Sequence, residues 1–179
     1  LIIVNALVTP MLDLNVPFTE MMASNIYLWR LILASLAVFL LMAGCPGLHA
    51  YQAARSGSFG KVAFALAFVG CALLFAHEWA QVFYVHSLAV VAPEALQAVE
   101  DVAGLNLYDL EAVIALMTFT LGWIVFAASM IRAGVFHRLA PILVIAGFFA
   151  TPLFTVLTTV KLGGALGNAV LGSGFILLG

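Results

Sequence analysis

Charged residues are scarce in this sequence of 179 residues. Asp, Glu, Lys and Arg together make up 8% of the chain, whereas 65% of the residues are apolar. A soluble domain contains roughly a quarter charged residues, so this composition excludes a soluble enzyme, a disordered tail and a nucleic-acid binder. What remains is an integral membrane protein with most of its length in the lipid bilayer.

Cysteines are also few, and the common catalytic motifs are missing. Cys45 and Cys71 both lie in apolar runs, at a spacing that matches no metal or redox motif, so we expect two small buried side chains. The sequence contains no nucleophile elbow, phosphate-binding loop or dinucleotide fingerprint. The sequence therefore favours a protein without catalytic residues, and it indicates no particular cofactor.

Long apolar runs dominate the sequence. A helix needs about 20 apolar residues to cross a hydrocarbon core of roughly 30 Å. In lipid the backbone must satisfy its own hydrogen bonds, so the runs predict an all-α, polytopic transmembrane bundle that forms one domain over residues 1–179. Four runs are complete spans, and the second of these can continue to Val91. They lie at residues 26–49, 61–84, 108–131 and 139–160, with partial spans at 1–11 and 164–179.

Both chain ends lie inside apolar runs. The sequence begins with Leu1-Ile2-Ile3-Val4, without a Met, and it stops after Phe175-Ile176-Leu177-Leu178. This pattern predicts that both ends are truncated and that the two terminal spans are parts of longer ones.

The loops between the spans differ in charge. Loops 49–61 and 132–138 contain basic residues and no acids, whereas loop 86–107 contains three acids. The positive-inside rule places the two basic loops in the cytoplasm and loop 86–107 on the exterior. Within that loop, Pro93 opens a predicted short helix that lies on the outer surface. Its apolar residues recur at helical spacing, at Leu96, Val99, Val102 and Ala103.

The two basic loops resemble each other. Residues 55–63 (RSGSFGKVA) align without a gap with residues 132–140 (RAGVFHRLA), and Gly70 then aligns with Gly147. One interpretation is a parallel repeat of two helical hairpins, related by an axis along the membrane normal. The other is that two cytoplasmic turns meet the same interfacial demands.

Charged and polar residues inside the spans are the candidate site. Charges in a span are costly and mark functional positions by default. The candidates form one outer-leaflet layer: Arg30, His77, Glu78, Gln81 and Tyr84. We expect Arg30 and Glu78 to form an ion pair, which either clasps two helices together or belongs to a site for a ligand or ion. A metal site is not expected, because His77 and Glu78 are adjacent and diverge by about 100° on a helix.

The last predicted span is rich in glycine. Gly163 and Gly167 form one small-residue row, and Asn168 and Gly172 belong to a second. Such rows let helices approach closely, and Asn168 can hydrogen-bond across the contact. The rows predict packing inside the monomer or contact with another membrane subunit.

One resemblance rests on three short motifs. They are Arg-Ser-Gly-Ser-Phe-Gly-Lys at 55–61, Ala-Phe-Val-Gly at 67–70 and His-Glu-Trp at 77–79. In these motifs, the stretch from Ile26 to Thr151 resembles small uncharacterised multi-pass proteins of bacterial inner membranes. The resemblance implies a location in a bacterial inner membrane, and it implies no particular activity.

Three functions are compatible with these observations. The first is a non-catalytic subunit or scaffold of a larger membrane complex, which contacts lipid and, through its last helix, other subunits. The second is a small transporter or ligand-binding membrane protein that uses the outer-leaflet layer. The third is a pigment- or haem-binding subunit with His77 or His49 as an axial ligand.

Overall fold

The computed structural model describes residues 3–101 and 106–179, and every element within these ranges is a helix. The elements are η1 (Ile3–Val8), η2 (Thr9–Met11), α1 (Phe18–Ala23), α2 (Asn25–Ala80), η3 (Gln81–Val85), α3 (His86–Val91), α4 (Pro93–Glu100), α5 (Leu107–Ala133), α6 (Leu139–Leu157) and α7 (Val160–Leu178). The all-α prediction is confirmed. Residues Leu1 and Ile2 of the first apolar run, and Val102 and Ala103 of the predicted surface helix, lie outside the described residues.

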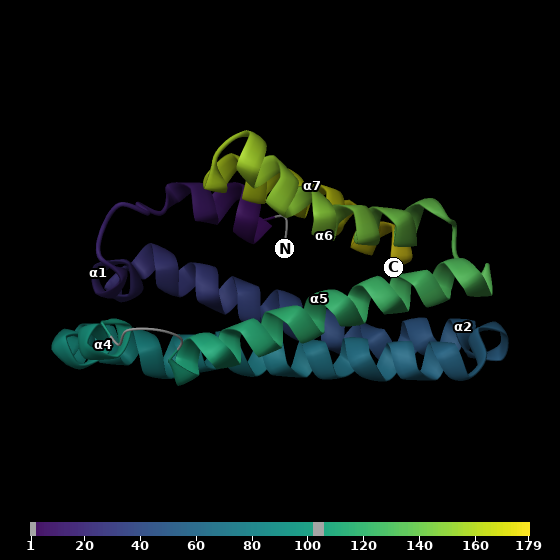
Figure 1. Ribbon diagram of the computed structural model, residues 1–179, viewed down its shortest axis with the longest axis horizontal. Coiled ribbons are helices and arrows are strands. Elements are labelled where there is room, and N and C mark those ends of the chain that lie inside the picture. The colour runs from purple at the N-terminus through teal and green to yellow at the C-terminus, as the bar shows by residue number, and fades with distance from the viewer. Residues whose placement is uncertain (1–2, 102–105) are drawn as a thin grey trace.

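Helix α2 is a hairpin that turns back at Gly57 (Figure 1). The backbone of Gly57 has a φ of 59° and a ψ of −151°, a conformation that glycine adopts without a steric penalty. The first arm (25–56) and the second arm (58–80) lie antiparallel, and the His49 ring stacks on the Phe64 ring at 4.6 Å. The predicted turn between two spans is thus a single glycine.

The second arm continues past residue 84, which is the extension that the apolar run allows. It runs through η3 and α3 to Val91, so that Asn25–Val91, 67 residues, is helical on both sides of the turn at Gly57. Residues 86–91 remain apolar apart from His86 and Ser87, and α3 packs against α1. Loop 86–107 therefore begins with helix, and α4 follows directly with Pro93 in its first turn.

Among the residues that the structure describes, four helices are long and apolar enough to cross a membrane. They are Asn25–Val91, Leu107–Ala133, Leu139–Leu157 and Val160–Leu178. Because the first is a hairpin, the four supply five apolar segments, as expected for a multi-pass integral membrane protein. Helix α7 begins four residues earlier than the sequence suggested, because Thr159 caps its N-terminus by accepting a hydrogen bond from the Leu162 amide.

The helices form two layers (Figure 1). The α2 hairpin and α5 make one layer, and the α6–α7 hairpin lies across it with η1 alongside α7. The second arm and α5 touch through their backbones. A Cβ atom added at Gly70 would lie 2.6 Å from the Cα atom of Phe119, and one added at Gly122 would lie 2.7 Å from the Cα atom of Ala67. Small residues thus allow the second arm and α5 to approach closely.

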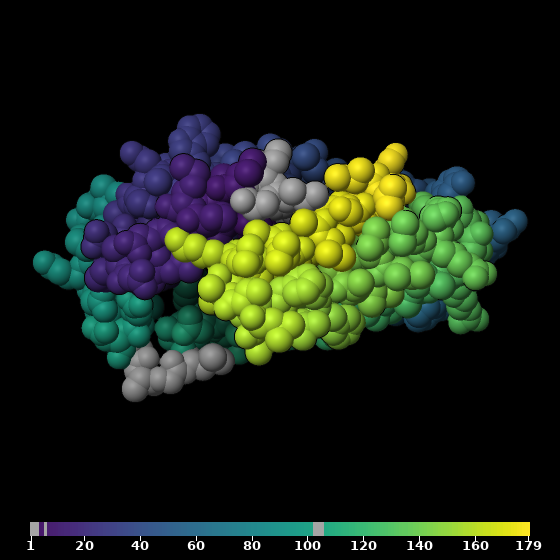
Figure 2. All heavy atoms as spheres, turned by 90° about the horizontal axis from the view of Figure 1, so that it is seen from above, coloured from purple at the N-terminus to yellow at the C-terminus, as the bar shows by residue number. Residues whose placement is uncertain are grey.

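The N-terminal segment lies beside the α6–α7 hairpin (Figure 2). Lys161, in the first turn of α7, donates hydrogen bonds from Nζ to the backbone oxygens of Pro10, at 3.1 Å, and of Leu12. Leu12 also belongs to a buried cluster with Met22, Tyr27 and Leu96, among others. This cluster joins the N-terminal segment to α1, α3 and α4 at one end of the bundle, which we call the α4 end.

Candidate functional site

A cavity of about 300 Å³ opens between the two arms of α2 and α5, near the α4 end. We call it the polar chamber, because charged and hydrogen-bonding side chains make up much of its wall. Its lining residues are Phe18, Met22, Tyr27, Arg30, Leu74, His77, Glu78, Gln81, Tyr108, Ala112 and Leu116. Four of the five residues predicted for the outer-leaflet layer line this chamber.

A chain of hydrogen bonds crosses one wall of the polar chamber. Glu111 Oε2 lies 2.6 Å from His77 Nδ1, and His77 Nε2 lies 2.6 Å from Gln81 Nε2. The Tyr27 hydroxyl then donates to Gln81 Oε1 at 3.3 Å. The chain links α5, the second arm and the first arm, and it runs from the half-exposed Glu111 to the buried Tyr27.

This chain defines the tautomer of His77. The Gln81 amide nitrogen can only donate, so His77 Nε2 must accept. The imidazole proton then sits on Nδ1 and is donated to the Glu111 carboxylate. The His77 ring also lies 5.6 Å from the Tyr108 ring, which holds it from a second side. His77 is therefore a fixed part of the chamber wall.

Arg30 and Glu78 line the same chamber without touching. Within residues 3–101 and 106–179, the ion pair found is His77–Glu111, and the predicted Arg30–Glu78 pair does not form. The Arg30 guanidinium lies over the Tyr27 ring, 5.4 Å from its centroid, because the two residues are one helical turn apart. Glu78 Oε2 is buried and has no hydrogen-bond partner among the described residues. The two opposite charges therefore line one cavity without a direct ion pair.

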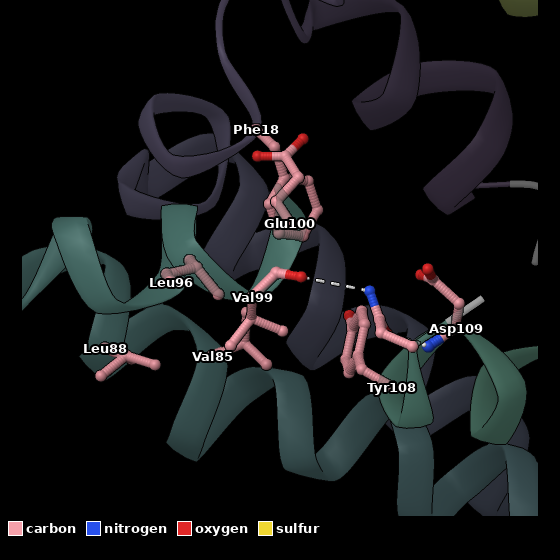
Figure 3. A pocket seen from close by; sticks show the side chains of 9 residues that line it. Phe18, Val85, Leu88, Leu96, Val99, Glu100, Tyr108 and Asp109 are labelled. Carbon is pink, nitrogen blue, oxygen red and sulfur yellow. Dashed lines mark hydrogen bonds between the residues drawn. The ribbon is translucent and has the colours of Figure 1, made fainter. Parts of the chain in front are cut away.

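A second cavity, also about 300 Å³, adjoins the polar chamber toward the α4 end (Figure 3). We call it the apolar chamber. Val85 and Leu88 face Tyr108 across it, and Asn106 Nδ2 donates to the Val99 carbonyl at 3.3 Å beside it. Its lining residues are Phe18, Val85, Leu88, Leu96, Val99, Glu100, Asn106, Tyr108 and Asp109. Phe18 and Tyr108 line both chambers.

The residues that line the chambers differ in part from the predicted ones. Tyr84 is 75% exposed and lines neither chamber. Its direction changes because the π-helix η3 (Gln81–Val85) replaces the regular turn after Gln81. Tyr27 and Tyr108 were missed, although their polar hydroxyls inside apolar runs, close to Arg30 and Asp109, were an available signal.

The glycines of α7 pack against α6 within the chain. A Cβ at Gly163 would collide with the backbone of Thr155, and one at Gly167 with the backbone of Thr151. Gly172 is also buried. Asn168 donates to the Gly164 carbonyl at 2.9 Å, one turn earlier in its own helix, rather than across a contact. The row of Gly163 and Gly167 is thus occupied by α6, whereas a Cβ at Gly164, in the second row, would meet nothing within 4 Å among the described residues.

Two histidines were candidate axial ligands. Both ring nitrogens of His77 already have hydrogen-bond partners, so a cofactor would have to displace Glu111 or Gln81. His49 has a buried Nδ1 without a partner among the described residues, but its ring is stacked on Phe64. In the described ranges, no group of three His, Cys, Asp or Glu side chains is arranged to hold a metal ion.

No family model, curated protein or solved structure matches this chain.

Proposed function

We propose that this protein is a membrane protein that binds a small polar ligand in the polar chamber. The unpartnered Glu78 oxygen carries this proposal. Leaving a buried acceptor without a hydrogen bond costs about 1–3 kcal/mol, and more for a charged group. A ligand that donates a hydrogen bond to Glu78 removes that cost, so the site favours an occupant with an N–H or O–H donor.

The placement of Arg30 supports a ligand rather than a structural clasp. A clasp needs direct contact between the two charges, and Arg30 instead lies over Tyr27. Tyr27, Gln81 and Tyr108 also line the chamber, and their hydroxyl and amide groups are hydrogen-bond donors and acceptors. A few convergent polar groups in a cavity of about 300 Å³ are typical of small-molecule sites.

Thermal stabilisation by four classes of small solute tests this proposal. The purified protein in detergent is heated with millimolar organic ammonium ions, carboxylates, zwitterionic amino acids or neutral polyols. We expect at least one class to raise the Tm, because a ligand that binds only the folded state stabilises it. Glu78→Gln should abolish the increase, because the amide presents no charge and a different donor pattern.

A matched acid at the same end serves as the control. Glu94 is exposed in the first turn of α4 and lines neither chamber. Glu94→Gln should keep the wild-type increase in Tm. If no class raises the Tm of the wild-type protein, or if Glu94→Gln and Glu78→Gln lose the increase equally, the polar chamber is not a ligand site.

We propose a bacterial inner membrane as the location, with loops 49–61 and 132–138 in the cytoplasm and the α4 end on the exterior. The basic residues Arg55, Lys61, Arg132 and Arg138 support this orientation. Both basic turns lie at the end of the bundle opposite α4 (Figure 1). The polar chamber then opens in the outer leaflet.

We also infer that the two hairpins that meet at these turns are an internal repeat. The aligned Gly57 and Gly134 both have positive φ, at 59° and 65°. The same alignment pairs Gln52 with Ser129, and Gln52 Nε2 donates to Ser129 Oγ at 3.0 Å. Equivalent residues meet each other where a two-fold axis passes between them, which is the relationship expected of a parallel repeat.

A second candidate function is a subunit or scaffold of a larger membrane complex. Two exposed glycines of the first arm favour this function. A Cβ at Gly44 or Gly47 would meet nothing within 4 Å in the described part of the chain. Small exposed residues let a helix of another chain approach closely. Gly47→Leu should then release a co-purifying membrane partner, as measured by native mass spectrometry, while Gly164→Leu on α7, which is equally open, should retain it.

A further inference from the structure

The ligand class of the polar chamber can be narrowed, and this step rests on the proposed function. We propose that the ligand is an organic ammonium ion with an attached apolar group. Its ammonium nitrogen binds beside Glu78, and its apolar group occupies the apolar chamber beneath α4. Three independent observations carry this proposal: the adjoining chambers, the excess of acids and the aromatic walls.

The two chambers adjoin each other and differ in polarity. Phe18 from α1 and Tyr108 from α5 line both chambers, so a ligand that touches these two rings touches both spaces. The polar chamber contains Arg30, Glu78 and Gln81, whereas apolar side chains such as Leu88 dominate the other. A purely polar solute leaves the second space unfilled, and a purely apolar one leaves Glu78 without a partner. An amphiphilic molecule satisfies both.

The acids around the chambers favour a positive charge. Among the described lining residues of the two chambers, Glu78, Glu100 and Asp109 are acidic and Arg30 is basic. Glu111, behind His77, adds a further carboxylate. Several carboxylates around low-dielectric walls raise the local concentration of cations and repel anions. The site therefore selects an ammonium ion over a carboxylate or a phosphate.

The aromatic side chains supply a second kind of contact for a cation. A cation is attracted to the face of an aromatic ring, most strongly where water is excluded. The Tyr27 ring already has the Arg30 guanidinium 5.4 Å from its centroid. Tyr108 and Phe18, at the junction of the chambers, offer two more rings to an ammonium group that enters toward Glu78.

The test compares four probes that differ in one group each. They are 2-phenylethylammonium, ethylammonium without the ring, 2-phenylethanol without the charge, and phenylalanine with an added carboxylate. Binding is measured by calorimetry on the full chain in nanodiscs, and empty nanodiscs correct for partition into lipid. We expect 2-phenylethylammonium to bind most tightly, with each other probe about tenfold to a hundredfold weaker. Ethylammonium loses the buried apolar group, 2-phenylethanol loses the charge contact, and phenylalanine adds a carboxylate that the acids of the site repel.

Two variants separate the contributions of the chambers. Glu78→Gln should remove the preference for 2-phenylethylammonium over 2-phenylethanol. Leu88→Trp should fill the apolar chamber and weaken 2-phenylethylammonium about tenfold without changing ethylammonium. Val90→Trp is the control, because Val90 is exposed on the same helix and lines neither chamber.

The outcomes distinguish this inference from the proposed function. If phenylalanine or a carboxylate binds most tightly, or if ethylammonium binds as tightly as 2-phenylethylammonium, the polar chamber is a ligand site but the amphiphilic cation is the wrong ligand class. If none of the four probes binds the wild-type protein and none of the four solute classes stabilises it, both proposals are overturned. The wild-type comparison requires no variant, so it stands even where a substitution prevents folding.

Discussion

His77 Nδ1 lies 2.6 Å from Glu111 Oε2, and this contact joins the second arm of α2 to α5 beside the polar chamber. The His77 side chain is 11% exposed and the Glu111 side chain 48% exposed. One end of the contact is therefore open to solvent, which weakens the electrostatic attraction, while the other end is held by Gln81. The pair positions the imidazole more than it stabilises the fold.

The first prediction follows from this asymmetry. Glu111→Gln should lower the free energy of unfolding by only about 1 kcal/mol, since a half-exposed pair contributes little. His77→Ala should cost more, because it also leaves the buried Gln81 amide without its partner. A double-mutant cycle with these two variants in detergent measures the coupling. A coupling of several kcal/mol would contradict the positioning role.

The second prediction concerns the close approach of the second arm to α5. Gly70→Ala places a Cβ 2.6 Å from the Cα atom of Phe119, so the two backbones must separate. Overpacking of this kind typically costs about 1–3 kcal/mol. Gly44→Ala is the matched control in the same helix, because a Cβ there meets nothing within 4 Å among the described residues. It should be neutral, or stabilise by up to about 1 kcal/mol through helix propensity.

Thermal unfolding in detergent compares the two variants with the wild-type protein. The Tm of Gly70→Ala should fall, and that of Gly44→Ala should stay level or rise. Equal effects would mean that the backbones of the second arm and α5 do not meet at Gly70.

The apolar runs were sufficient to predict the helices, because a span of about 20 apolar residues has few alternatives in lipid. The apolar run also allowed the second arm to continue through His86 to Val91, but it did not predict the contact that holds His86 there. His86 Nδ1 makes a contact of 2.7 Å with the Met22 carbonyl, so a residue that suggested a loop is satisfied inside a helical packing. Tertiary contacts of this kind are not visible in a local pattern.

Depth along a helix could be estimated from the sequence, but direction around it could not. Arg30 and Glu78 do reach one chamber, as their predicted depth implied. Whether they touch depends on side-chain direction, and Arg30 lies along its own helix over Tyr27. Tyr84 turns away because η3 adds a residue to the helical turn, a feature with no signature in the residue pattern.

The third prediction concerns membrane orientation. In a background with Cys45→Ala and Cys71→Ala, a cysteine at Ser58 should be shielded from an impermeant thiol reagent in intact cells. A cysteine at Ala98 in α4 should be labelled. Both positions are exposed in the structure, so access depends on the side of the membrane. The opposite labelling pattern would invert the orientation and place the polar chamber in the inner leaflet.

The last prediction uses the buried hydrogen bond between the two hairpins. Gln52 Nε2 donates to Ser129 Oγ at 3.0 Å, and Ser129 Oγ donates to the Phe126 carbonyl at 2.7 Å. Gln52 Oε1 has no partner among the described residues. Ser129→Ala therefore leaves the whole Gln52 amide unsatisfied and should cost about 1–3 kcal/mol.

Gln52→Leu leaves Ser129 bonded to Phe126 and removes an unsatisfied oxygen, so it should cost less than Ser129→Ala or even stabilise the protein. The double variant Ser129→Ala/Gln52→Leu should then recover most of the loss caused by Ser129→Ala alone. Thermal unfolding of the three variants in detergent measures this order. If Gln52→Leu is the more damaging single change, Gln52 has a partner beyond Ser129, and the hairpin junction holds a polar group that these contacts do not account for.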